Sequence, residues 1–152
     1  QFTDWAVEWS HIKTIALSLS RETNLVEFGS GISTKYLSKF TNKITSFEHD
    51  EKYAGENIEV RPLKDGWYNL LKKDLTTISK ADVIFIDGPI GRTGDRYNFP
   101  NEVIDKIDSN SIIFVDDCHR DKDLKQAKYI AKRLKKSITL IKGTQKILAK
   151  IQ

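Results

Sequence analysis

Two acidic residues flank a short turn that contains two glycines. Glu27 lies two residues before Gly29, and Glu48 lies 19 residues after it. Glycine lets the backbone adopt unusual dihedral angles and approach a ligand closely. A carboxylate beside such a turn can bind a cationic group, and a second one after the next strand can accept hydrogen bonds from ribose hydroxyls. The pattern therefore predicts a ligand with a ribose and a cationic or hydroxyl-rich end.

Three further carboxylates follow two apolar runs in the second half of the chain. Asp87 comes directly after one run, and Asp116 and Asp117 come directly after another. Carboxylate oxygens of this kind are the ligands that hard divalent cations such as Mg²⁺ prefer. His119 follows closely, and either His119 or Asp87 could act as a general base toward a hydroxyl group.

Short apolar runs alternate with amphipathic segments, and together they predict the elements that position these residues. Strands are expected at residues 25–28, 43–48, 58–60, 82–86 and 111–115, and helices at 3–21, 33–40, 99–107 and 122–136, with a short helical turn at 50–55 and an ambiguous segment at 67–78. The last two apolar runs, 138–141 and 146–151, are separated by four residues. They must be antiparallel neighbours, because a parallel return needs a crossover of about a dozen residues or more.

The predicted fold is α/β, with a doubly wound, mostly parallel seven-stranded sheet, a C-terminal antiparallel hairpin and helices on both faces. In such sheets, ligands bind beyond the carboxyl ends of the strands, near the switch in strand order. The acidic residues described above all lie at or just after the ends of predicted strands, so we expect them to converge at that edge. A helix that begins near Ser33 should point its amide N–H groups at the same space.

Length and composition fit one domain. The 152 residues are expected to form a single domain (1–152), with an N-terminal helix within residues 1–22 packed on it. The inward face of that helix is expected to consist of Trp5, Trp9, Ile12, Ala16 and Leu19. The net charge is +4, and the single cysteine, Cys118, excludes an internal disulfide framework and a cysteine-rich zinc site.

The sequence carries no export or membrane signal. No apolar run approaches the ~18–20 residues that a membrane span requires, and no signal peptide is visible. We therefore expect a cytoplasmic protein without a membrane span. The chain begins at Gln1 and contains no methionine, so we interpret it as a processed or trimmed piece.

The segment Glu27-Phe28-Gly29-Ser30-Gly31-Ile32-Ser33-Thr34, together with Phe47-Glu48-His49-Asp50, resembles the first two motifs of class I S-adenosylmethionine-dependent methyltransferases. The resemblance covers the chain from about residue 24 to its end, and it implies binding of S-adenosylmethionine. By this resemblance, the methionine moiety would be surrounded by Glu27, Gly29, Gly31 and Ser33, and Ser30 would also bind the cofactor. Glu48 would bind the ribose, His49 or residues 65–68 would contact the adenine, and Asp87 would also lie at the cofactor.

A second resemblance concerns the type of reaction. Metal-dependent O-methyltransferases of the catechol type carry an Asp after the fourth strand and an Asp-Asn or Asp-Asp pair after the fifth, and Asp87, Asp116 and Asp117 match these positions. This similarity implies Mg²⁺ or another divalent cation, which would chelate the acceptor hydroxyl and lower its pKa. In a metal-free reaction, Asp87 or His119 would be the general base.

The expected acceptor is a small hydroxylated metabolite or a glycan. Enzymes that methylate nucleic-acid bases usually carry a Pro-Pro-aromatic motif after the fourth strand, whereas this chain has Asp87-Gly88-Pro89-Ile90. A nucleic-acid partner is therefore not expected. Arg92, Arg96 and Tyr97, in the loop that follows, could bind an anionic or sugar-like acceptor.

Two other classes of function remain open. An NAD-dependent oxidoreductase would share the fold, but its fingerprint needs a small residue at the position of Thr34, and Glu27 would repel a pyrophosphate. The other class is a non-catalytic methyltransferase-like binding domain, because a chain this short has little room for an acceptor lid of its own.

Overall fold

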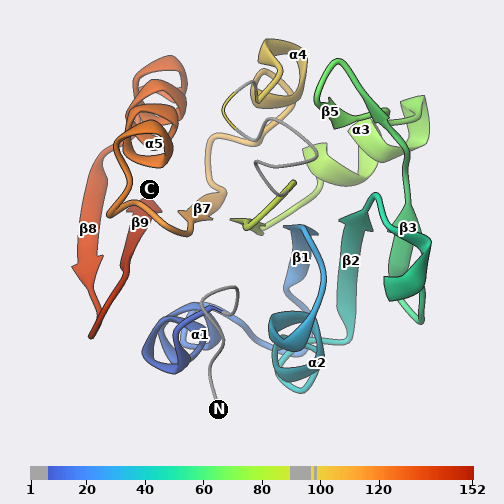
Figure 1. Cartoon of the computed structure of the whole chain (residues 1–152), viewed down its shortest axis with the longest axis horizontal. Coiled ribbons are helices and arrows are strands. Elements are labelled where there is room, and N and C mark those ends of the chain that lie inside the picture. The colour runs from blue at the N-terminus through green and yellow to red at the C-terminus, as the bar shows by residue number, and fades with distance from the viewer. Residues whose placement is uncertain (1–6, 90–96, 98) are drawn as a thin grey trace.

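The structure, a computed structural model, describes residues 7–89, 97 and 99–152 of the chain (Figure 1). The strands are β1 (Asn24–Phe28), β2 (Lys43–Glu48), β3 (Ile58–Val60), β4 (Leu63–Lys64), β5 (Trp67–Tyr68), β6 (Val83–Ile86), β7 (Ile112–Val115), β8 (Ile138–Lys142) and β9 (Ile147–Ile151). The helices are α1 (Trp9–Ala16), α2 (Ile32–Leu37), the 3₁₀ turn η1 (Glu51–Tyr53), α3 (Lys72–Ser79), α4 (Asn101–Ile104) and α5 (Asp121–Leu134).

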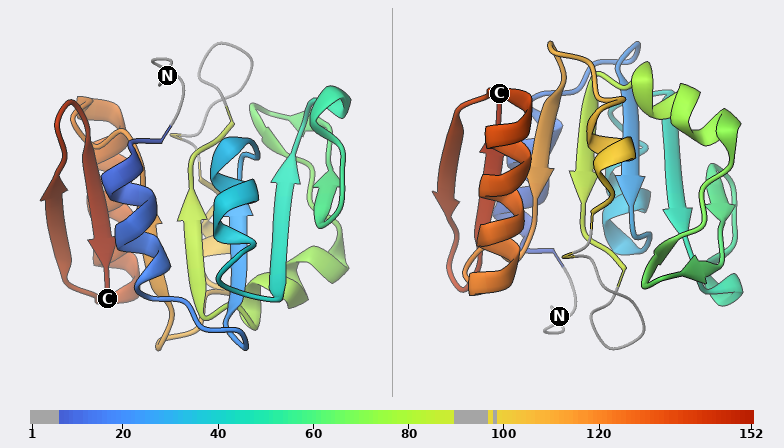
Figure 2. Two further views of the ribbon diagram at one scale, coloured as in Figure 1. Left: turned by 90° about the horizontal axis from the view of Figure 1, so that it is seen from below. Right: turned by 90° about the horizontal axis from the view of Figure 1, so that it is seen from above.

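The elements form three layers. Within the described residues, a seven-stranded sheet lies between two layers of helices. Helices α3, α4 and α5 cover one face of the sheet, and α1 and α2 cover the other (Figure 2). None of the helices in this part of the chain has the length and hydropathy of a membrane span.

The strand order shows where a ligand site can form. In the large sheet the order is β3-β2-β1-β6-β7-β9-β8, and every strand except β9 runs in the same direction. The order reverses between β1 and β6, and a crevice at the carboxyl ends of the strands is expected at such a switch. The predicted fold class, including the antiparallel hairpin of β8 and β9, is confirmed. Strands β4 and β5 form a separate antiparallel pair that the sequence did not predict.

The continuous apolar runs of the central strands follow from burial on both faces of the sheet. In β1, Val26 and Phe28 belong to the core that includes residues of α3, α4 and α5, whereas Leu25 belongs to the core on the side of α1 and α2. Side chains alternate along a strand, so Glu27 shares the layer of Leu25. An acidic side chain is thereby placed between the sheet and α2.

The N-terminal helix is shorter than predicted and rotated about its axis. The buried side chains of α1 are His11, Ile12 and Ile15. Trp9 is 38% exposed, and its ring meets that of Tyr36 edge-on with 4.6 Å between centroids, so its predicted inward position was wrong. The rotation is set just before the helix, where Glu8 accepts hydrogen bonds from the N–H of Gln145 at 3.0 Å and from the next residue. Trp5 lies outside the described residues.

Helix boundaries differ from the prediction in two other places. The ambiguous segment 67–78 contains strand β5 and most of helix α3. Helix α4 fills only part of the expected 99–107, and α2 ends at Leu37, three residues before the predicted end. Periodicity identified these elements, but it could not show where tertiary contacts end them.

A buried ion pair joins the end of β3 to the start of α3. The Nε and Nη2 of Arg61 donate to the two carboxylate oxygens of Asp74 at 2.8 and 3.0 Å, and both residues are more than nine-tenths buried. Asp74 also accepts a hydrogen bond from the N–H of Leu71 at 2.7 Å, which caps the helix. The pair therefore holds both ends of the connection that carries Trp67 and Tyr68.

We expect Asp74→Asn to lower the free energy of unfolding by about 3–5 kcal/mol, because it removes the buried counter-charge of Arg61 and leaves this guanidinium to the exposed carboxylate of Glu59, 3.3 Å away. Urea denaturation measures the loss. Asp105→Asn is the matched control, since it breaks the bidentate pair of Asp105 with Arg133 at 2.7 and 2.8 Å on the surface. Exposed pairs contribute little, so equal losses for the two variants would contradict the structural role given to Asp74.

Candidate functional site at the carboxyl edge of the sheet

The glycine turn after β1 continues the hydrogen bonding of the sheet. The N–H of Gly29 donates to the carbonyl of Phe47 at 2.8 Å, and the N–H of Asp87 donates to the carbonyl of Phe28 at 2.8 Å. The turn is thus tied to the end of β2 on one side and to the end of β6 on the other. These bonds place it at the switch point of the sheet.

Gly29 has a steric reason to be glycine. Its φ is +92°, and a Cβ there would lie 3.0 Å from both the carbonyl carbon and the oxygen of Asp87. A Cβ on Gly88 would lie 3.0 Å from the Cα of Gly29 and 2.5 Å from the hydroxyl oxygen of Tyr68. Two glycines therefore let the ends of β1 and β6 meet backbone to backbone.

Gly31 has a different environment from Gly29. Its N–H donates to the Oγ1 of Thr34 at 3.1 Å. A Cβ at Gly31 would meet no heavy atom of the described residues within 4 Å. The turn therefore packs tightly at its first glycine and opens at its second, where a ligand can lie against the backbone.

Glu27, the acid before the turn, is fully buried. Within the described part of the chain its carboxylate accepts hydrogen bonds from the hydroxyls of Ser33 at 2.8 Å, Ser46 at 2.8 Å and Thr34. Burial raises the pKa of Glu27, the three hydroxyls oppose this rise, and the charge of Glu48 adds to it. The carboxylate joins β1 to β2 and α2. Its binding of a cationic ligand stays a prediction.

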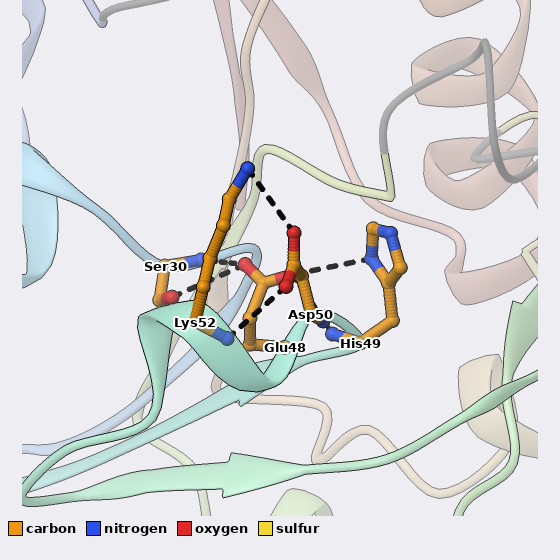
Figure 3. Close-up of polar contacts among 5 residues, drawn as sticks. All are labelled: Ser30, Glu48, His49, Asp50 and Lys52. Carbon is orange, nitrogen blue, oxygen red and sulfur yellow. Dashed lines mark hydrogen bonds and ion pairs between the residues drawn. The ribbon is translucent and has the colours of Figure 1, made fainter.

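Glu48 closes β2 and is 6% exposed. Its Oε2 accepts hydrogen bonds from the N–H and the hydroxyl of Ser30 at 3.0 and 3.1 Å (Figure 3). Its Oε1 accepts from the N–H of His49 at 2.8 Å and lies 3.1 Å from the Nδ1 of the same residue. The side chain of Asp50 turns instead to Lys52, 3.2 Å from its ammonium. Glu48 thus spans the distance between the glycine turn and η1.

Trp67 and Tyr68, in the segment predicted to contact an adenine, are 4% and 3% exposed and belong to an aromatic cluster. Their ring centroids lie 5.4 and 5.9 Å from that of Phe28, and Phe99 lies 4.7 Å from Trp67. These two rings therefore pack against Phe28, the residue that precedes the glycine turn. Of the aromatic side chains predicted to contact the adenine, that of His49 is the most accessible, at 17% exposed.

The three carboxylates that were predicted to converge do so. One oxygen from each of Asp87, Asp116 and Asp117 can be chosen so that all lie within 4.8 Å of one another. Asp116 and Asp117 are buried, whereas Asp87 is half-buried. Burial and the charge of Asp117 raise the pKa of Asp116, while Lys146 and a contact with Asp87 oppose the rise. The charged form of Asp116 is therefore disfavoured relative to that of an aspartate in water.

Lys146, which the sequence did not single out, belongs to the same cluster. Its Nζ lies 3.3 Å from the Oδ1 of Asp117, and Arg120 approaches the other oxygen at 3.7 Å. The N–H of Cys118 donates to the carbonyl of Ile147 at 2.8 Å, which holds the start of β9 beside the end of β7. The oxygens suit a hard cation in their chemistry, but a cation of the protein itself already lies against one of the three carboxylates.

Other predicted residues are less closely tied to the cluster. His119 is exposed on the segment between β7 and α5. Arg92 and Arg96 lie outside the described residues.

The single cysteine is buried beside the cluster. Burial raises the pKa of the Cys118 thiol to about 12. Burial thus favours the neutral thiol, which is the form typical of a structural cysteine.

A groove of about 630 Å³ runs between α5 and the segment that leads into α4. It is lined by Tyr97, Phe99, Asn101, Lys122, Lys125, Gln126 and Tyr129. Gln126 is 7% exposed, and its Nε2 has no hydrogen-bond partner within the described ranges. Phe99 meets Phe28 edge-on at 5.5 Å, so the groove adjoins the glycine turn through one aromatic contact. The lysines were not among the predicted site residues, because their spacing is also that of a solvated helix face.

Comparison with known proteins places the fold. No protein-family model matches the sequence, and a search of curated proteins finds no match. A methyltransferase from Pyrococcus furiosus is 20% identical, with a TM-score of 0.63 over 99% of this chain and 86% of that one. An S-adenosylhomocysteine-bound methyltransferase from Podospora anserina is 13% identical, with a TM-score of 0.60 over 98% and 80%. An rRNA methylase from Streptococcus thermophilus is 13% identical, with a TM-score of 0.59 over 94% and 93%.

At these identities the similarity shows the fold alone. This chain has the fold of these methyltransferases, as the resemblance of its two motifs and the order of its predicted elements implied. The names of these neighbours include an rRNA methylase, so the fold does not identify the acceptor.

Gly29→Ala should lower the free energy of unfolding by about 2–4 kcal/mol, because the added methyl group meets the Asp87 backbone and the φ suits glycine. Thermal or urea denaturation measures the loss. Gly55→Ala is the control, since a Cβ there would meet the Cδ1 of Ile58 at an ordinary 3.7 Å. Tolerance of alanine at position 29 would show that the close contact between β1 and β6 is not required.

Proposed function

We propose that this protein is an S-adenosylmethionine-dependent methyltransferase that acts on a hydroxyl oxygen of a small acceptor. The observation that carries the proposal is the position of Glu48, a nearly buried carboxylate at the end of β2 that is hydrogen-bonded across to the glycine turn. An acidic residue at this place in a doubly wound sheet binds ribose hydroxyls. The S-adenosylhomocysteine-bound neighbour with the same fold supports the choice of cofactor.

The residues of the turn suit the two ends of this cofactor. Ribose hydroxyls would replace the Ser30 hydroxyl as donors to Glu48, while the N–H of His49 keeps its bond to the other oxygen. The methionine end would lie along Gly29 and Gly31, where the second glycine faces open space. The nearby carboxylates favour a ligand whose sulfonium and ammonium groups are positive.

The reaction needs a base beside the methyl group. When bound, the cofactor supplies an electrophilic methyl carbon on a positively charged sulfur. The acceptor oxygen would take this methyl group as its carbon–sulfur bond breaks, and the base would accept the hydroxyl proton. We assign this role to Asp87, because it is the half-buried member of the carboxylate cluster and its backbone touches Gly29. His119, exposed after β7, is the second candidate.

The two alternative functions make different demands on the site. A dinucleotide would place a pyrophosphate at a turn that adjoins Glu27, Glu48 and Asp87, and like charges at such distances repel. A non-catalytic domain would bind the same cofactor but would methylate no acceptor. Cofactor binding separates the first alternative from our proposal, and methyl transfer separates the second.

Titration calorimetry should detect binding of S-adenosylmethionine and S-adenosylhomocysteine but not of NAD. Glu48→Ala should weaken this binding by about 10- to 100-fold, because hydrogen bonds to a charged group contribute roughly 1.5–3 kcal/mol. Glu51→Ala, an exposed glutamate in η1, is the matched control and should leave the affinity unchanged. Binding of NAD without a response to either adenosyl compound would overturn the proposed function.

For the acceptor, we propose a hydroxylated metabolite or sugar that carries an anionic group, bound in the groove beside α5. Two exposed lysines, Lys122 and Lys125, are donors on its α5 side. The ammonium of Lys122 also lies 5.3 Å from the ring centroid of Tyr97. Aromatic walls with a few convergent donors suit a ring that bears a carboxylate or phosphate.

A screen of hydroxylated compounds with and without an anionic group should find methyl transfer to the anionic ones. The double variant Lys122→Glu with Lys125→Glu should raise the KM for the acceptor by about tenfold or more, because it reverses two charges in the groove, and should leave cofactor affinity unchanged. Lys128→Glu with Lys132→Glu, exposed on α5 outside the groove, is the control. Intact cofactor binding without transfer to any compound would favour the non-catalytic alternative.

A further inference from the structure

We infer that Lys146 is the resident cation of the carboxylate cluster, and that the protein binds no divalent metal ion there. The inference departs from the metal-dependent reaction that the sequence predicted for Asp87, Asp116 and Asp117. Its consequence for catalysis rests on the proposed methyltransferase function, whereas the cation site itself can be tested without it.

The first support is the geometry of the ion pair. The Nζ of Lys146 lies 3.3 Å from the Oδ1 of Asp117, and the two side chains are 11% and 6% exposed. Asp116, the neighbour of Asp117, is fully buried. A charged pair in such surroundings is weakly screened by water and salt. The ammonium therefore balances the cluster much more strongly than a surface lysine would.

The second support is that the backbone of Lys146 is held from several sides. Its carbonyl accepts a hydrogen bond from the N–H of Gly143 at 2.8 Å, and its N–H donates to the Oε2 of Glu8 at 3.2 Å. The next residue, Ile147, accepts from the N–H of Cys118 at 2.8 Å. Contacts with the N-terminal segment and with the residues after β7 thus fix the backbone from which the side chain of Lys146 reaches the carboxylate cluster.

The third support is the space that a metal would need. A divalent cation bound by these carboxylates would lie about 2.0–2.6 Å from their oxygens. It would share Asp117 with an ammonium that is already in contact, and the two positive charges would repel each other at close range. Binding would require Lys146 to leave a site from which water is largely excluded. The three carboxylates therefore offer the oxygen ligands that a metal ion needs, but the positive charge of Lys146 beside them disfavours a divalent cation.

For the proposed reaction, a fixed ammonium has a defined consequence. Lys146 acts through Asp117 and is a positioning residue: it keeps the buried carboxylates in place and lowers the net negative charge that faces the acceptor oxygen. Fixed charges of this kind stabilise developing charge without reorganisation. Methyl transfer should accordingly proceed without added metal and should be unaffected by EDTA.

The test is calorimetric titration of the full chain with MgCl₂, CaCl₂ and MnCl₂. The wild type should show no binding, whereas Lys146→Met should bind at least one of these cations measurably, because the buried ammonium beside Asp117 is gone and the remaining cation, Arg120, is exposed and 3.7 Å from the other oxygen. Lys146→Arg, which keeps a positive charge, should behave as the wild type does. Lys142→Met removes an exposed lysine from the same hairpin and should also leave the titration unchanged.

Each outcome decides the inference. Divalent-cation binding by the wild type at the affinity of Lys146→Met would overturn it, and so would a folded Lys146→Met protein that gains no binding. Circular dichroism establishes folding, and Lys146→Gln provides a second neutral variant if the methionine variant unfolds. Cofactor titration is a separate measurement: its failure would overturn the proposed function while the cation result stands.

Discussion

The site depends on the backbone contact between Gly29 and the end of β6. A Cβ at Gly29 would lie 3.0 Å from the carbonyl carbon and oxygen of Asp87, so the contact leaves no room for a side chain at this position. It closes the sheet at the switch in strand order, where the crevice for a ligand lies. The same contact places Asp87 beside the turn, so the candidate cofactor site and the candidate base are held by one interaction.

The second constraint is electrostatic, because several carboxylates gather at one edge of the sheet. The fold balances each of them in a different way. Glu27 is buried under three hydroxyls, and Glu48 receives backbone N–H groups from both sides. Asp117 has the ammonium of Lys146, and burial leaves Asp116 with a raised pKa. The acids therefore stay close together without a metal ion as a requirement.

Periodicity and turn chemistry predicted most of the elements, because burial on both faces of a parallel sheet leaves continuous apolar runs. The orientation of α1 could not be found in this way. Trp9 lies on the expected stripe, but the rotation of the helix is set by Glu8, whose partners lie more than 130 residues further along the chain. The sequence pattern also does not predict the pairing of Arg61 with Asp74, because charged residues such as these are usually exposed.

By itself, the sequence determined the fold class and the places where acidic residues follow strands, because both depend on local patterns. The convergence of Asp87 with the pair after β7 followed from the parallel direction of their strands. Only the tertiary structure decided that Lys146 joins them. Because β9 runs antiparallel to the other strands, its first residues lie at the edge of the sheet where the parallel strands end. Lys146, 29 positions after Asp117 in the sequence, therefore lies next to Asp117. No spacing in the sequence encodes that contact, because it depends on which strand β9 pairs with and in which register.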